Sequence, residues 1–330
     1  MNWAEGFSAS YKAYQVDPNT WEDLEEVPII SGSINRDSGD ALLESASLDV
    51  REKLGEIWIR VYLLADQGGV VRVPLFTGLT ATPTRALDGQ RESYSVDCYS
   101  RLKVAADKML PLGYYVAAGT RAAETAVQLL KTAGITATCA VGSGNLTNYI
   151  IAEGSETVLT MVHRIVQAIG WQVAIDGRGQ VRIVPPDTSI KATFGGDIDV
   201  IELAVNDTDD WYSCPNVLRV TCGSQTAVVY DDDSASDLSI QARGREIWAQ
   251  ESVSMSDTSA LPVYARQRLK ELQAHTRTLT YTRRFHPEVG LGSVVSIAYP
   301  QSGLAGNFRV RSQKITLGHG AKTEEEVYEY

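Results

Sequence analysis

The chain has 330 residues, of which 44% are hydrophobic, so it can bury a sizeable core and we expect two or three domains. Its formal net charge of −11 argues against a general nucleic-acid-binding protein, because neutralising phosphates requires clustered Lys and Arg. No apolar stretch approaches the roughly 20 residues of a membrane span, and the start lacks a targeting segment, so we expect a soluble protein made in the cytoplasm without stable membrane association.

The first hundred residues predict short strands separated by turns. Residues 56–64 give the clearest strand, and the sequence Asp-Gln-Gly-Gly separates them from residues 70–76, which predicts a hairpin. Further strands are expected at residues 7–16, 29–34, 45–50 and 93–99. Such a series is typical of a barrel or sandwich, and we predict an N-terminal β-barrel domain over residues 1–104.

The middle of the chain predicts a small α+β domain over residues 105–198. Helical spacing of apolar residues indicates helices at 120–133 and 157–169, the second with Ser155 as a candidate cap. Residues 171–175 and 180–184 flank the sequence Asp-Gly-Arg-Gly, which predicts a hairpin with a glycine-rich turn.

The last part of the chain, residues 199–330, predicts a C-terminal β-barrel domain with a single helix at about 256–273. The expected strands lie at residues 200–205, 216–222, 225–230, 245–253, 276–285, 292–299 and 308–317. The predicted fold is therefore mainly β, with two antiparallel β-barrel domains, a smaller α+β domain and one long helix near the C-terminus.

Candidate metal and cofactor sites are weak. The cysteines, Cys98, Cys139, Cys214 and Cys222, fit no zinc spacing and are read as free thiols in a reducing compartment. None of the four histidines, His163, His275, His286 and His319, has a second ligand at metal-binding spacing. Acidic segments at 206–210 and at 231–233 with Asp237 could attract a hard cation, but solvated loops are the simpler interpretation. We expect neither a metal nor a cofactor.

No catalytic set can be recognised. Paired carboxylates for hydrolysis need two groups in one cleft, and Glu251, Asp257 and Glu288 can be named without any signal that singles them out. No Gly-x-Ser-x-Gly elbow lies between a strand and a helix. The densest basic cluster combines Arg266 and Lys270 on the predicted helix with Arg283 and Arg284 on the next strand, and suits either a partner or solvent.

Several segments together are similar to those of one protein family. They are residues 30–37 followed by 43–50, residues 165–186 with their helix and Asp-Gly-x-Gly hairpin, and the ordered C-terminal segments 216–220, 243–247, 264–272, 291–297 and 308–315. In this order the chain resembles the bacteriophage tail-hub, or baseplate-hub, proteins, a family that includes late-control-type hubs and the hub part of contractile injection machines.

The resemblance implies a non-enzymatic structural protein at the virion tail tip, assembled in the host cytoplasm. It implies a homotrimeric ring in which each copy contributes two related β-barrels, so that the tail tube meets pseudo-sixfold symmetry. One side of the ring would bind the tail tube or a distal tail protein, and the other a central spike or fibre protein. DNA would meet the protein only in transit, through an acidic lumen that repels its phosphates. From the sequence we expect no added lysozyme, peptidase or fibre domain, and this expectation favours a structural role over an enzymatic one.

Candidate interface residues are the aromatic and arginine side chains near strand ends: Trp58, Tyr62, Trp211, Tyr212, Trp248, Arg283 and Arg284. Two alternatives stay open. One is a cell-wall hydrolase, which needs an acid and a base with separated pKa values in a cleft. The other is a carbohydrate-binding tail-tip component that uses exposed Trp and Tyr rings as sugar platforms.

Overall fold

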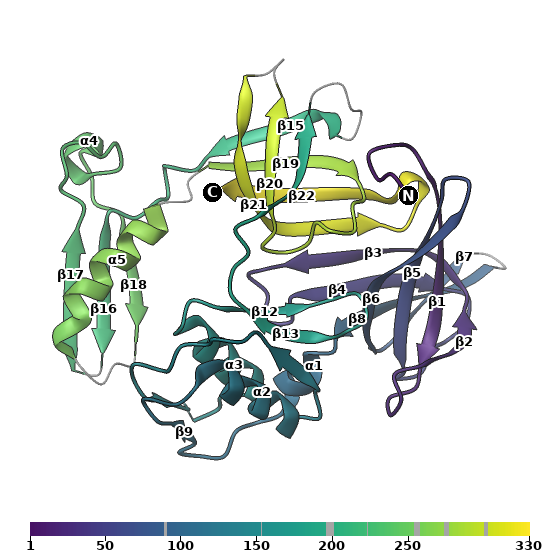
Figure 1. Ribbon diagram of the computed structural model, residues 1–330, viewed down its shortest axis with the longest axis horizontal. Coiled ribbons are helices and arrows are strands. Elements are labelled where there is room, and N and C mark those ends of the chain that lie inside the picture. The colour runs from purple at the N-terminus through teal and green to yellow at the C-terminus, as the bar shows by residue number, and fades with distance from the viewer. Residues whose placement is uncertain are drawn as a thin grey trace.

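The computed structural model describes residues 1–88, 91–152, 154–195, 201–222, 224–253, 258–273, 277–299 and 303–330. Within these residues, fourteen strands join in one continuous sheet, and the remaining strands form small sheets of two or three. The chain is mainly β with an α+β part, as predicted. Figure 1 shows the large sheet across the upper and right-hand regions, with the α+β part below it.

The N-terminal half-sheet consists of the first eight strands. Alternating inward residues such as Ala46, Leu48 and Val50 bury one face and form its core. Its strands are β1 (Ser8–Val16), β2 (Asp23–Val27), β3 (Ile29–Asp37), β4 (Glu44–Val50), β5 (Trp58–Asp66), β6 (Val70–Thr80), β7 (Thr84–Asp88) and β8 (Arg91–Ser100). All six predicted strands and the β5–β6 hairpin are confirmed, whereas β2 and β7 were not predicted.

The C-terminal half-sheet has a separate apolar core around Phe194, Leu279, Phe308 and Val327. Its strands are β14 (Ile190–Gly195), β15 (Ile201–Asp209), β19 (Arg277–Arg284), β20 (Val294–Tyr299), β21 (Leu304–Thr316) and β22 (Lys322–Glu329), with a 3-10 turn, η3 (His319–Ala321), before the last strand. The sequence predicted residues 308–317 as the last strand, and this is wrong. A further strand, β22, follows and pairs with both β19 and β21.

One seam joins the two half-sheets. The second half of β21, residues 312–316, pairs antiparallel with residues 37–33 of β3. The first half of β21 pairs instead with β20. This long strand is therefore shared, and it makes one wall out of two separately packed halves.

The α+β part, residues 101–184, has its own core of inward-facing helix and strand residues. It contains α1 (Lys103–Asp107), β9 (Tyr115–Val116), α2 (Ala122–Thr132), β10 (Ala137–Cys139), β11 (Ile150–Ile151), α3 (Val158–Gln167), β12 (Gln172–Ile175) and β13 (Val181–Val184). Both predicted helices and the β12–β13 hairpin are confirmed. The cap of α3 is Thr157 rather than Ser155, since the Thr157 hydroxyl accepts from the Thr160 amide at 3.3 Å.

Residues 210–273 form a lobe with a fourth core. It contains β16 (Val217–Cys222), β17 (Gln225–Tyr230), α4 (Ile240–Arg243), β18 (Trp248–Ser252), a 3-10 turn, η1 (Thr258–Ala260), and α5 (Leu261–Gln273). The predicted helix thus begins at Leu261, with Pro262 in its first turn, while residues 254–257 lie outside the described ranges. It packs on the lobe's own three-stranded sheet instead of on the final strands.

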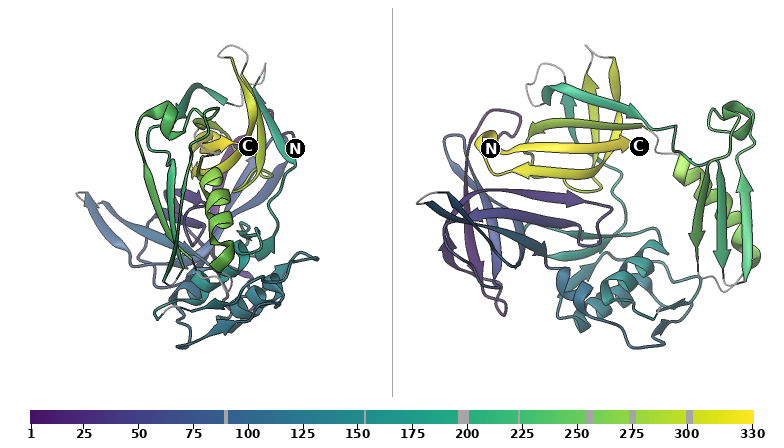
Figure 2. Two further views of the ribbon diagram at one scale, coloured as in Figure 1. Left: turned by 90° about the vertical axis from the view of Figure 1, so that its left-hand side faces the viewer. Right: turned by 180° about the vertical axis from the view of Figure 1, so that it is seen from behind.

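The lobe is an insertion between two paired strands. β15 ends at Asp209 and β19 begins at Arg277, and these two residues lie opposite each other in the sheet. Figures 1 and 2 show the lobe standing beside the large sheet rather than within it. The predicted domain boundaries at 104/105 and 198/199 stay a prediction, and the last predicted domain contains two cores. Among the described helices, none has the length and apolar character that a membrane crossing requires.

Candidate assembly site

A buried ion pair lies close to the seam between the half-sheets. Arg283, predicted at a partner interface, is only 1% exposed. Its Nε donates to Glu325 Oε2 at 2.7 Å, and the Tyr281 hydroxyl donates to the same oxygen at 2.7 Å. Burial raises the pKa of Tyr281 well above its ordinary value. The interface assignment of Arg283 is therefore wrong for the folded chain: this side chain anchors β19 to β22.

The polar network continues from this pair across the seam. Gln313 on β21 donates to Glu325 and, at 3.0 Å, to the backbone oxygen of Val289. Arg36 on β3 donates to the Gln313 side-chain oxygen at 3.2 Å and to the Leu75 backbone oxygen at 2.6 Å. Polar side chains from both half-sheets thus satisfy each other's hydrogen-bonding groups, and this network fixes how the two half-sheets meet at the seam.

A cavity of about 400 Å³ lies where the two half-sheets meet the α+β part. Its charged and titratable lining residues come from all three parts: Arg36, Glu44, His163, Asp176, Arg182, Glu288, Arg309 and Tyr328. Basic and acidic side chains both line it. Among the described residues, no group of three or more His, Cys, Asp or Glu could hold a metal ion.

Glu44 is the unusual residue of this cavity. It is buried at the start of β4, its nearest cation is Arg36 at 3.5 Å, and its Oε1 atom has no hydrogen-bond partner. Burial raises the pKa of this carboxyl to about 8, although Arg36 works in the opposite direction. The junction therefore contains a carboxyl that favours its protonated form near neutral pH.

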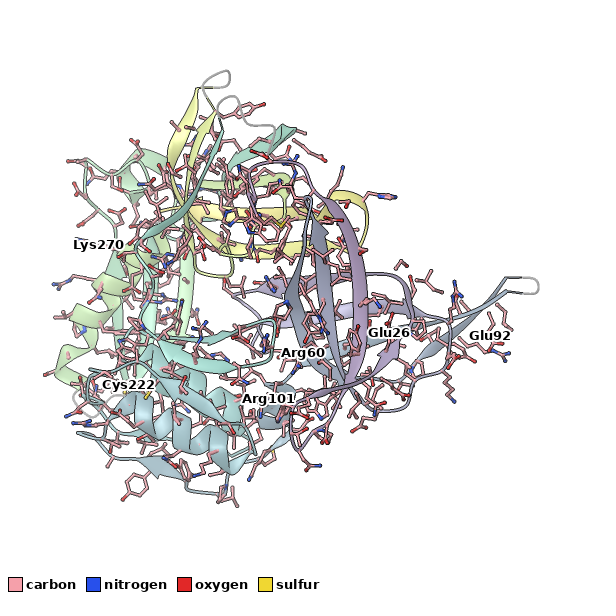
Figure 3. All side chains as sticks on the ribbon, turned by 45° about the vertical axis from the view of Figure 1, so that its right-hand side comes forward. Glu26, Arg60, Glu92, Arg101, Cys222 and Lys270 are labelled. Carbon is pink, nitrogen blue, oxygen red and sulfur yellow. The ribbon has the colours of Figure 1, made fainter. Side chains whose placement is uncertain are left out.

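The β12–β13 turn fastens the α+β part to the N-terminal half-sheet. The backbone oxygen of Gly177 accepts from the Thr77 hydroxyl at 2.8 Å, and Thr77 in turn accepts from Arg60 Nε at 2.9 Å. A Cβ atom on Gly177 would lie 2.1 Å from the Pro74 backbone oxygen, so only glycine permits this approach. Figure 3 labels Arg60 between the two parts. The sequence pattern indicated a turn here but did not reveal the docking.

Trp58, Tyr62 and Arg284, also predicted at an interface, have partners within the chain. Trp58 packs edge-on against Trp21, with ring centroids 5.1 Å apart. Tyr62 is buried and donates to Asp23 Oδ2 at 2.7 Å, so it too is wrongly assigned as an interface residue. Arg284 is half-buried and donates to the Ala4 backbone oxygen at 3.1 Å.

Trp211, Tyr212 and Trp248 all lie on the lobe and are exposed by 53%, 67% and 41%. The guanidinium of Arg245 lies 4.1 Å from the centre of the Tyr212 ring. Trp248 lies on the sheet face opposite α5 and packs edge-on against Tyr230 at 6.1 Å. An interface role for these three residues stays a prediction.

Neither the predicted basic cluster nor the acidic loop at residues 231–233 forms a binding site within the described residues. Arg266 and Lys270 lie on the lobe, away from Arg283 and Arg284, so the predicted basic cluster does not form (Figure 3 labels Lys270). In the 231–233 loop, Asp231 accepts from Ser236 at 2.8 Å and from Gln273 at 2.9 Å, which is a loop-bracing role.

Of the three carboxylates considered for hydrolysis, the two that the structure describes, Glu251 and Glu288, lie in different parts of the molecule. Glu251 is bound by Arg268 at 2.8 Å on the lobe, whereas Glu288 lines the junction cavity. Asp257 and His275 lie outside the described residues.

No protein-family model and no curated protein sequence matches the chain. Solved structures do match over almost its whole length. The tail protein from Neisseria meningitidis MC58 has a TM-score of 0.73 at 17% identity, covering 98% of this chain and 97% of that chain. The prophage MuSo2 43 kDa tail protein from Shewanella oneidensis has a TM-score of 0.67 at 14% identity, covering 97% of each.

A more distant match comes from the lidless PdpA–VgrG complex of Francisella. It has a TM-score of 0.57 at 9% identity, covering all of this chain and 66% of that chain. The resemblance to tail-hub proteins stated from the sequence is thereby confirmed as a likeness of fold.

Proposed function

We propose that this chain is a structural hub protein of a bacteriophage or phage-like tail tip, and that it works as an assembly part rather than an enzyme. The observation that carries the proposal is the full-length match in fold to two tail proteins, with most of both chains covered in each case. A match of that extent involves the half-sheets, the α+β part and the lobe together, rather than one common module.

The two half-sheets support a ring of three copies. Each has its own core, each is proposed to form one barrel, and the seam makes them neighbours in one wall. Three chains with two barrels each would present six similar units to a tail tube or distal tail protein. The opposite side would carry a central spike or fibre protein, as the VgrG match also favours. DNA would pass through the lumen at the tail tip, after assembly in the host cytoplasm.

The net charge of −11 supports passage without adhesion, because an acidic wall repels phosphates. Mapping the charge of the assembled ring checks this, and a basic lumen would contradict it.

The main experiment measures assembly. The purified chain is mixed with the tail-tube or distal tail protein encoded beside it, and complexes are analysed by native mass spectrometry and electron microscopy. We expect rings with three copies of this chain on the tube end. A chain that stays monomeric in the presence of those partners, and that is missing from purified virions, would reject the proposal.

The lobe suggests a second function. Its exposed Trp211, Tyr212 and Trp248 rings are the kind of surface that stacks on sugars, so this part could bind host-surface glycans. A glycan array with the wild-type chain and Trp248→Ala tests it. Specific binding that the substitution removes favours this function, and an empty array argues against it.

A further inference from the structure

One strand of the α+β part, β12, has an open edge inside the molecule. Its small sheet has the order β10-β13-β12, so within the described residues β12 pairs with β13 alone. Every residue from Trp171 to Gly177 lines the junction cavity, and so does every residue from Pro287 to Ser293. Since the side chains of a strand alternate between its two faces, this unbroken run indicates that the cavity follows the edge of β12. Figure 1 shows β12 on the side of the α+β part that faces the large sheet.

The open edge presents the backbone groups of Val173 and Ile175. In an antiparallel pair, successive residues direct their N–H and C=O groups alternately toward the neighbouring strand and away from it. The Ile183 oxygen on β13 accepts from the Ala140 amide at 3.0 Å, so the backbone groups of Ile183 point away from β12. Val173 lies opposite Ile183 in the register, and its own groups therefore point to the open side, as do those of Ile175 two residues later.

These backbone groups lie in a poor environment for unpaired polar atoms. Val173 is only 6% exposed, and within the described residues the outward groups of Val173 and Ile175 have no hydrogen-bond partner. Buried backbone N–H and C=O groups in folded proteins are almost always paired. Glu44, another lining residue of the same cavity, has a buried Oε1 atom that also lacks a partner. Two independent sets of polar groups at one cavity thus indicate a missing ligand.

We propose that this groove binds an extended segment of another tail protein, which adds to β12 as a fourth strand of the small sheet. The inference rests on the proposed hub function and adds a docking site to it. β12 has four residues, which span about 13 Å at about 3.3 Å per residue. The cavity holds about 400 Å³, so it has room for one extended chain but not for a folded domain. Such added strands gain affinity from main-chain hydrogen bonds and specificity from their side chains.

The lining predicts the side chains of the bound segment. Residues beside Val173 and Ile175 would face the apolar core of the α+β part, against which both of these side chains pack. A residue beside Ala174 would lie on the other face, where Arg182 is opposite Ala174 in the register. Arg182 lines the cavity, is exposed, and forms no ion pair with any described residue. An apolar–acidic–apolar sequence therefore suits the groove, because opposite charges on one sheet face attract.

Hydrogen exchange read by mass spectrometry tests whether a strand is added. The whole chain is measured alone, as rings of this chain, and after assembly with the distal tail, spike and fibre proteins encoded beside it. We expect exchange in the fragment that contains Val173 and Ile175 to slow about tenfold or more on assembly with one of those proteins. The fragment that contains Ile183 is the internal control, because β13 already pairs on both sides.

Two arginines of the same hairpin give a matched pair of charge variants. Arg182 and Arg178 are both exposed, but only Arg182 lines the cavity. We expect Arg182→Glu to weaken binding of the protecting tail protein by about tenfold, because it repels the acidic residue of the segment. Arg178→Glu should leave the affinity unchanged. Both affinities are measured by biolayer interferometry with the immobilised full-length chain.

A proline substitution tests the main-chain contact. Val173→Pro removes an outward N–H and leaves the hydrogen bonds to β13 in place, so we expect cooperative unfolding to persist and binding to fall by about tenfold or more. The control is Val228→Pro on the lobe's edge strand β17. Because Asp231 and Asn216 form a hydrogen-bonded pair, the Val228 N–H also points away from its neighbouring strand β16. Binding should be unchanged in this control.

The possible failures are distinguishable. Tail tips that assemble normally without slower exchange at residues 173–175, or that bind wild type and Arg182→Glu equally, overturn the docking site and leave the hub proposal standing. Slower exchange in rings of this chain alone would identify a second copy as the occupant, and so would overturn the assignment to another tail protein. A chain that neither assembles with those proteins nor occurs in virions rejects both proposals.

Discussion

At the scale of residues, the Arg283–Glu325 pair makes a clear prediction about stability. Both side chains are fully buried, so Glu325→Gln leaves a guanidinium in the core without its countercharge. We expect the free energy of unfolding to fall by about 3–5 kcal/mol, measured by urea denaturation. The control is Glu324→Gln on the same strand, which is exposed and should change stability by less than about 0.5 kcal/mol. Similar losses in the two variants would mean that the buried pair has no special role.

Glu44 predicts how stability depends on pH. Its pKa is about 8 in the folded chain, against 4.5 as the ordinary value. Because the folded state retains this proton over that window while the unfolded state releases it, the carboxyl lowers stability as pH rises from about 4.5 to 8. We expect Glu44→Gln to gain stability relative to the wild type by about 2–5 kcal/mol between pH 5 and pH 8.5, at 1.36 kcal/mol per pH unit.

Paired urea titrations at the two pH values measure this difference. Other carboxyls titrate in both proteins and cancel in the comparison. A gap between the two proteins that stays constant with pH would show that Glu44 is ionised in the fold like a surface carboxyl.

Some of these residues could be recognised from the sequence and others could not. Leu279, Tyr281 and Arg283 share one strand face by a period of two, which is a signal that Arg283 points into the core. Glu325 alternates in the same way with Thr323 and Val327. The sequence does not reveal that Arg283 pairs with Glu325. The two-residue alternation of a strand shows which side chains share a face, but it does not identify the neighbouring strand or the residue opposite.

At the scale of elements, the β12–β13 turn is a fastening as well as a turn. Gly177→Ala places a Cβ atom against the Pro74 backbone oxygen, which cannot move without distorting β6. We expect a loss of about 1–3 kcal/mol, together with faster proteolysis between the α+β part and the half-sheet. Gly154→Ala in the same part is the control, since nothing lies within 4 Å of its added atom. Equal protease resistance of the two variants would contradict the docking.

Strands with clear apolar alternation were predictable, and the missed ones share a physical cause. β2 and β7 are edge strands made of exposed, largely polar residues, so they lack an apolar face to detect. β22 shows no clear alternation of apolar and polar residues, because Glu325 occupies one of its buried positions. The β21–β3 seam joins residues that are far apart in the sequence. It could not be predicted, because it depends on how the two half-sheets pack against each other.

At the scale of the whole molecule, we expect that the lobe can be deleted without unfolding the large sheet. Its chain leaves and re-enters the large sheet at Asp209 and Arg277, which already lie opposite each other. Replacing residues 210–276 by an Asn-Gly turn therefore converts β15 and β19 into an ordinary hairpin. Because the lobe's core uses none of the residues of the other three cores, we expect the shortened chain to keep its β-rich circular dichroism and a cooperative unfolding transition.

The same deletion distinguishes what the lobe does. If the large sheet forms the wall of the proposed ring, the shortened chain still assembles into trimers on the tail tube, because all fourteen strands of that sheet are retained. Loss of spike, fibre or glycan binding alone would then assign those contacts to the exposed rings at Trp211, Tyr212 and Trp248. A shortened chain that folds yet forms no trimer would instead place the subunit interface on the lobe, and the large sheet would no longer be the wall of the ring.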